Sequence, residues 1–317
     1  MSQSPDLMSR PPDAVGARAS RRRVPWLVLT LVAALVACLG LLAADRRGDL
    51  GPGAAADRVS DDAERQGDSD DGAKDKSAPK PSPVTYPDET TTGVPAGVVL
   101  TPSGPLTITQ QGAVIDGLEI TGTVVVAADN VTIKNSRILN TGSIALRNEG
   151  VNLVVIDTEI DGQGKGIPAV AFNNYSLLRV NIHNVREGPR IAGSNVTIEA
   201  SYVHHLVQAD GNHTDVIQAV GGSHIVVRGN NLQAYNPVTG TRGNAAFMFG
   251  EDDNPLRDCL VEGNYMNGGN YTVNGGGSGT SGAECAFRKN TFGPDFRFGT
   301  HANLGPNVSW GSTNSVR

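Results

Sequence analysis

The sequence predicts an all-β fold, a single-stranded right-handed parallel β-helix of about eight coils over residues 96–317. Two observations predict it. Eight segments fit one template with apolar first, third and eighth positions and a small or turn-forming residue at the fifth or sixth; they begin at Ala113, Val131, Leu153, Tyr175, Val196, Ile225, Cys259 and Cys285. In addition, four successive segments are preceded by the same residue type: Asn130, Asn152, Asn174 and Asn195.

Residues at the same template position in successive segments should stack on one another and form apolar columns. The third position holds Ile115, Ile133, Val155, Leu177, Ile198, Val227, Val261 and Phe287, and the eighth holds Ile120, Ile138, Ile160, Ile182, Val203, Leu232, Met266 and Phe292. Short apolar alternations bounded by turn residues indicate two or three short strands per repeat. The regular period of about 20 residues is typical of solenoids, whose units bury their apolar faces only by stacking. A leucine-rich repeat would need Leu-dense or helical segments, and a sandwich would not keep a column in register.

The asparagine column indicates identical turns piled on one another. Stacked asparagines in parallel strands can hydrogen-bond side chain to side chain. We therefore expect Asn130, Asn152, Asn174 and Asn195 to form a ladder, and His224, which takes the same slot in a later coil, to be structural.

The N-terminal third differs from the repeats. Residues 1–23 are polar and end in three arginines, and residues 24–44 form an almost uncharged apolar run long enough to span a bilayer. Arginines before such a run place the N-terminus in the cytoplasm, which predicts a single-pass membrane protein with an extracellular C-terminal domain. Residues 45–95 are rich in Asp, Gly, Pro, Ala and Lys and lack a hydrophobic period, so they predict a disordered linker.

Two other interpretations of the apolar run stay open. Leu35–Cys38 resembles a lipoprotein signal with Cys38 as the lipidated residue, and Ala43 and Ala44 resemble the end of a cleaved secretory signal. All three interpretations export the repeat domain. In that oxidising environment we expect a disulfide between Cys259 and Cys285, since both take the first template position of consecutive coils.

The net charge of −6 argues against nucleic acid as a partner, because a protein that binds phosphates needs a basic face.

Side chains able to bind a ligand or do acid–base chemistry gather in one stretch of the sequence. Five of the six histidines fall between His183 and His224. His183 and His204 each follow the eighth template position of neighbouring coils, so they should project from one face, with His205 beside them. Arg186, Glu187 and Arg190 occupy the corresponding stretch of the earlier coil.

A loop that lengthens its coil carries further candidates. It runs from Gln208 to Asp215 and includes Asp210 and His213, and it leads into a strand with Gln218. Coil spacing grows after Val203, and extra residues in a solenoid go into loops on one face, often the binding face. Tyr235 lies in the first inserted segment. We expect these residues to line a groove beside the histidines.

The asparagine turns and the stretch Gly211–Gln218 resemble the pectin-lyase-like superfamily of right-handed parallel β-helix proteins, in particular bacterial exported β-helix repeat proteins. The resemblance covers about residues 96–317. It implies action on polysaccharides, mostly acidic ones, by lyases, hydrolases or epimerases. The paired aspartates of that superfamily's polygalacturonases and the carboxylate clusters of its calcium-dependent lyases are not evident here, so no cofactor is expected, with Ca²⁺ left open.

The residues favour lyase-type cleavage of a uronate-containing glycan. Arg190 would neutralise the sugar carboxylate, His213 would abstract the adjacent proton, and Asp215 would orient the imidazole. The substrate-binding candidates are His183, Arg186, His204, His205, Asp210, Gln218 and Tyr235. A hydrolase would instead need two carboxyl groups, for which Asp210 and Asp215 are the available pair.

Two further alternatives stay open. The same side chains could serve a noncatalytic glycan-binding or adhesive surface protein. Zinc binding by His204, His205, His213 and Asp215 suits the residue types but not a recognised zinc spacing. We expect a monomer whose partners are the polysaccharide and, through the N-terminal segment, the membrane.

Overall fold

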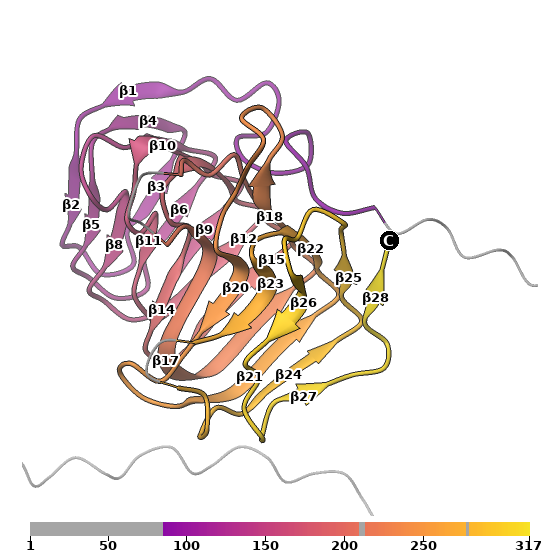
Figure 1. Ribbon diagram of the computed structural model, residues 1–317. Helices are drawn as coiled ribbons and strands as arrows, with labels where there is room; N and C mark the ends of the chain where they lie inside the picture. The colour runs from indigo at the N-terminus through magenta and orange to yellow at the C-terminus, as the bar shows by residue number, and fades with distance from the viewer. Residues whose placement is uncertain (1–84, 209–212, 277–278) are drawn as a thin grey trace, which may run out of the picture. The chain divides into compact units, whose positions relative to one another are not determined.

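The computed structural model describes residues 85–208, 213–276 and 279–317. Every regular element in these ranges is a β-strand, and the strands stack coil upon coil (Figure 1). None of the described residues forms a helix with the length and apolar character needed to cross a membrane. The predicted basic tail, apolar segment and most of the predicted linker lie outside the described residues.

The strands form three sides. The first side contains β1 (Thr101–Ser103), β4 (Leu118–Thr121), β7 (Arg137–Leu139), β10 (Glu159–Lys165), β13 (Asn181–Val185), β16 (Tyr202–His204), β18 (Asn231–Asn236), β22 (Tyr265–Gly268), β25 (Thr291–Phe292) and β28 (Ser315–Val316), in this order. One short strand, β19 (Thr241–Arg242), pairs antiparallel with β18. From β1 to β16 and again from β22 to β28, every third strand returns to this side, as expected for a coiled chain.

The second side contains β3 (Val114–Asp116), β6 (Thr132–Lys134), β9 (Leu153–Ile156), β12 (Tyr175–Leu178), β15 (Val196–Glu199), β17 (Asp215–Arg228), β21 (Leu256–Glu262), β24 (Cys285–Arg288) and β27 (Ser309–Trp310). The third side begins with β2 (Leu106–Ile108), β5 (Val124–Val126), β8 (Leu146–Asn148) and β11 (Val170–Ala171). It continues with β14 (Arg190–Ala192), the first part of β17, β20 (Ala245–Phe249), β23 (Tyr271–Gly275) and β26 (Gly299–Ala302).

These three stacks of parallel strands fit a parallel β-helix, and the predicted all-β class is confirmed. Strand β17 belongs to two sides, because its first residues pair with β14 and β20 and its last residues pair with β15 and β21. The strand turns the corner at Gly221 and Gly222, both with positive φ. A Cβ on Gly222 would overlap the carbonyl oxygen of Gly193, so the corner requires glycine.

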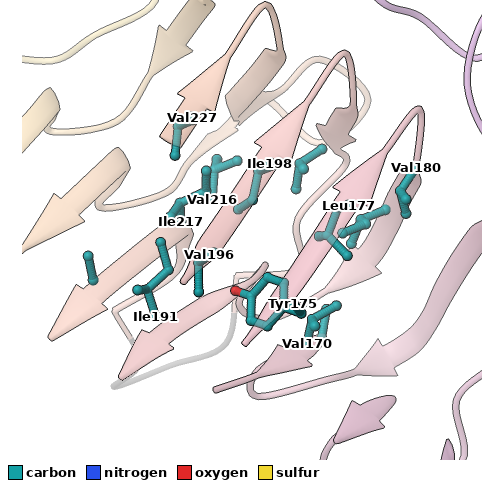
Figure 2. Packing of buried hydrophobic residues seen from close by; sticks show 14 of the residues in the cluster. Val170, Tyr175, Leu177, Val180, Ile191, Val196, Ile198, Val216, Ile217 and Val227 are labelled. Carbon is teal, nitrogen blue, oxygen red and sulfur yellow. The ribbon is translucent and has the colours of Figure 1, made fainter. Parts of the chain in front are cut away.

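The predicted register is confirmed. The third template position pairs from Ile115 through Ile133, Val155, Leu177, Ile198, Val227 and Val261 to Phe287. The eighth position pairs in the same way from Ile120 to Phe292. These side chains point inward and pack together as one core (Figure 2). Burial of each such aliphatic side chain contributes about 1.5–3 kcal/mol, which only stacked coils can supply.

Two asparagine ladders run along the stack. In the predicted, exposed one, Asn152 donates to Asn130 and Asn195 donates to Asn174, both at 2.9 Å, whereas Asn174 donates to Asn173 at 2.8 Å, so the side chains bond as two pairs. All four asparagines have positive φ, and so does His224 in the same slot. The second ladder is buried and was not predicted. There Asn230 donates to Asn264, Asn264 to Asn290 and Asn290 to Asn314 over 2.9–3.2 Å.

The predicted disulfide between Cys259 and Cys285 is confirmed. The two residues are register partners on β21 and β24, with Cα atoms 4.4 Å apart and an S–S distance of 2.06 Å. The parallel pairing alone brings the two first template positions together.

Residues 85–95, which the sequence assigns to the linker, lie against the first side. The Tyr86 ring packs 5.3 Å from that of Tyr265, and its hydroxyl donates to Thr291 Oγ1 at 2.7 Å. Further along, the Gly93 N–H donates to the Arg179 carbonyl at 2.9 Å. The segment therefore joins several coils, and contact with the coils begins before residue 96.

Candidate functional site

Three adjoining pockets form a groove along the outside of the coils. The central pocket, about 200 Å³, is lined by Ile167, Arg186, Glu187, Arg190, His213 and Gln218. The basic pocket, about 350 Å³, shares Ile167 and Arg186 with it and adds Thr141, Gly142, Ser143, Lys165 and Gly166. The acidic pocket, about 450 Å³, shares Arg190 and adds Phe172, Asn173, Ala192, Val220, Asp252 and Asp253. The shared residues make the three pockets one groove.

The third side positions the central pocket. Arg190 on β14 is the register partner of Gln218 on β17, and Gln218 in turn is the partner of Met248 on β20. Because alternate residues of a strand point outward, these side chains form a row on the outer face. Stacking therefore brings together Arg190 and His213, which are far apart in the chain, as the sequence predicts.

Arg190 already has an ionic partner. Its Nε and Nη2 donate to the two carboxylate oxygens of Glu187 at 2.7 and 2.5 Å. Glu187 is only 3% exposed, and its burial raises the pKa of the carboxyl although Arg190 opposes the shift. A substrate carboxylate at Arg190 would therefore have to share the guanidinium with Glu187.

Asp215 is buried behind the pocket and is only 1% exposed. Its Oδ1 accepts a hydrogen bond from Asn244 Nδ2 at 2.9 Å, while its Oδ2 has no partner. Burial raises its pKa to about 7, and the nearby Glu187 charge adds to the rise, so the carboxyl carries a proton in part of the molecules at neutral pH. Neither oxygen bonds to the His213 imidazole in this arrangement, so the expected orienting role of Asp215 is not seen.

His213 and Arg186 are the groups most open to a ligand in the central pocket. His213 is exposed, and it begins the described part of the chain after residue 208. Arg186 is half-buried, its Nε has no hydrogen-bond partner, and no ion pair of its guanidinium is found among the described residues. The site therefore offers a cation and an imidazole side by side.

The other three histidine candidates form a separate cluster on the first side. His183 and His204 are register partners with rings 5.4 Å apart, so the predicted stack is confirmed. His204 is buried, stacks on Tyr202 and bonds to Asn181 Oδ1 and to His205. Burial, with His205 and His183 nearby, lowers its pKa to about 3. None of the three lines the groove, so we assign them to packing of the first side.

One predicted ligand residue lies elsewhere, and another falls outside the described residues. Tyr235 is on the β18–β19 hairpin, with the Arg242 guanidinium 5.4 Å above its ring, and it does not line the groove. Asp210 lies outside the described residues, so the Asp210–Asp215 pair of a hydrolase has no described geometry.

Within residues 85–208, 213–276 and 279–317, no group of three or more His, Cys, Asp or Glu side chains is arranged to hold a metal ion. A larger cleft, about 640 Å³, lies on the second side beside the exposed asparagine ladder. Its imidazole and carboxylate, from His224 and Asp258, are both well exposed, so we place the candidate chemistry in the smaller groove.

Sequence reasoning placed Glu187 beside the two arginines but gave it no role in the site, and it did not consider Lys165. Glu187 stands between two arginines in the sequence, which was the available signal. Lys165 ends β10 beside three glycines and a glutamine, where nothing in the sequence marks a binding residue.

No protein-family model matches the chain, and the searches of curated proteins and of solved structures likewise returned no match. The functional assignment therefore depends on the geometry of the groove.

Proposed function

We propose that this protein binds an acidic, uronate-containing polysaccharide in the groove and cleaves it by a lyase-type reaction in the central pocket. The observation that carries the proposal is that Arg186, Arg190 and His213 line one open pocket on the outer face of the coils. Within the proposal, the coils wind in the right-handed sense of pectin-lyase-like proteins, as crossovers between parallel strands nearly always do. The apolar residues 24–44 export the domain and tether it to the membrane.

The chemistry of the step assigns a role to each group. The cations neutralise the sugar carboxylate, which makes the adjacent carbon-bound proton more acidic. The His213 imidazole takes that proton, and the electron pair of the broken carbon–hydrogen bond forms a carbon–carbon double bond. The neighbouring carbon–oxygen bond breaks, and the leaving oxygen takes a proton from water. Arg186 is better placed than Arg190 for the carboxylate, because Glu187 already neutralises Arg190.

The test is to replace His213 with asparagine in the full-length protein and to follow absorbance from newly formed unsaturated ends on uronate polymers. The His213→Asn variant should lose at least 100-fold in turnover while keeping its polymer affinity within about threefold. His224→Asn is the matched control, since asparagine fills that slot in four earlier coils. Equal turnover of the two variants would exclude His213 as the base.

A noncatalytic glycan-binding role is the second candidate. It is favoured by the missing contact between Asp215 and His213, which leaves the imidazole without an orienting carboxylate. A binder would show affinity for the polymer but no unsaturated ends from the unmodified protein, so the same assay separates the two functions.

A further inference from the structure

We propose that Lys165 forms a second anion subsite, in the basic pocket, that holds an acidic group about one coil before the one held by Arg186. The inference rests on the proposed function, because it treats the groove as the path of an acidic glycan, and it adds a residue and a direction to that path.

The basic pocket contains cations without ionic partners. Lys165 Nζ donates to the Thr141 carbonyl at 3.1 Å, and neither Lys165 nor Arg186 has an ion pair within the described parts of the chain. No acidic side chain lines the pocket. In addition, Arg186 Nε is buried without a hydrogen-bond partner, so the protein does not fully satisfy this guanidinium.

Several arginines elsewhere on the stack form ion pairs with carboxylates. Arg137 bonds to Glu159 and Glu119, Arg179 to Asp157, and Arg228 to Glu199, each from a neighbouring coil. The coils thus regularly supply a carboxylate beside an exposed arginine. At the basic pocket this pattern stops, and two cations are left facing the same space of about 350 Å³.

The register sets the spacing of the two cations. Lys165 on β10 is the partner of Val185 on β13, and Arg186 follows Val185 directly. Neighbouring parallel strands lie about 4.8 Å apart, so Lys165 and Arg186 are about one coil apart along the groove. A polymer with an acidic group on successive sugar units can meet Lys165 and Arg186 in turn. Its hydroxyl groups would face the Thr141 and Ser143 side chains that also line the pocket.

The opposite end of the groove has the opposite charge. Asp252 and Asp253 line the acidic pocket beyond Arg190. Like charges disfavour an acidic polymer there, so the chain should occupy the basic and central pockets rather than the whole groove.

The experiment measures the affinity of the full-length protein for a uronate oligomer of at least four units and for a sulfated oligosaccharide of the same length. Lys165→Gln should weaken binding three- to tenfold and reduce the dependence of affinity on salt. Lys134→Gln is the matched control, because Lys134 is 39% exposed, lies on the second side and carries the same charge. Equal affinities of Lys165→Gln and Lys134→Gln would overturn the subsite.

The outcomes for the subsite and for the proposed function are distinct. If the unmodified protein binds the uronate oligomer without cleaving it, and Lys165→Gln still weakens binding, the subsite stands and the lyase reaction falls. If only the sulfated oligosaccharide binds and depends on Lys165, the anion subsite stands and the uronate assignment falls. Failure to bind either oligomer would overturn both proposals.

Discussion

Replacing Asn264 with alanine is expected to lower the free energy of unfolding by about 4 kcal/mol. Asn264 is fully buried in the second asparagine ladder. Its side chain accepts from the Asn230 backbone N–H and from Asn230 Nδ2, both at 2.9 Å. It also donates to the Val227 carbonyl at 2.9 Å and to Asn290 Oδ1 at 3.0 Å. Four buried hydrogen bonds at about 1 kcal/mol each give the estimate.

The matched comparison is Asn152→Gly in the exposed ladder. Asn152 donates a single side-chain hydrogen bond, to Asn130 at 2.9 Å, and water can replace that partner. Glycine also tolerates the positive φ of 61° at this position. We expect a loss below about 1 kcal/mol. Urea unfolding followed by far-ultraviolet circular dichroism measures both variants, and losses within 1 kcal/mol of each other would refute the reasoning.

Three further predictions concern single contacts. Reducing the Cys259–Cys285 disulfide should lower the free energy of unfolding by about 3.5 kcal/mol, since it closes a loop with a sequence separation of 26; unchanged urea midpoints would contradict this. The pKa of Asp215 is about 7 in the folded protein against an ordinary 3.8, so its ionisation opposes folding as pH rises from 4 to 8. The Asp215→Asn variant avoids this cost, and its free energy of unfolding should rise relative to that of the unmodified protein by up to about 4 kcal/mol over that range. A pH-independent difference would exclude the shifted pKa. Tyr86→Phe should cost about 1 kcal/mol by removing the bond to Thr291, and no loss would show that residues 85–95 do not hold the coils.

The apolar columns made the fold predictable from the sequence. A one-residue slip would turn every inward side chain outward, so the alternation around Ile133, Val155 and Leu177 determines the register as well as the strand type. The disulfide follows from the same register. The pairing of β17 with strands on two sides did not follow, because the turn at Gly221 and Gly222 gives no apolar signal.

The buried ladder was missed because its residue types change along the column. The sixth template position holds Leu118, Ser136, Thr158, Val180 and Ser201 in the earlier coils, and asparagine only from Asn230 onward. The geometry is nevertheless shared, since Ser201 Oγ accepts from the Val180 N–H much as the Asn264 side-chain oxygen accepts from the Asn230 N–H. A column defined by hydrogen-bonding capacity, rather than by residue identity, would have revealed it.

The candidate site shows which property of a β-helix the sequence conveys and which it does not. Coil register brings Arg190 and His213 to one pocket, and the apolar pattern of the sequence determines that register. Whether each arginine has a carboxylate partner depends on side-chain directions, which the apolar pattern does not determine. Glu187 pairs with Arg190, three residues later, and leaves Arg186 without an ionic partner among the described residues. That difference moves the expected carboxylate-binding role from Arg190 to Arg186. Lys165 lines the basic pocket together with Arg186, whereas Arg190 lines the acidic pocket. The shift to Arg186 therefore also predicts that an acidic polymer extends from the central pocket toward Lys165.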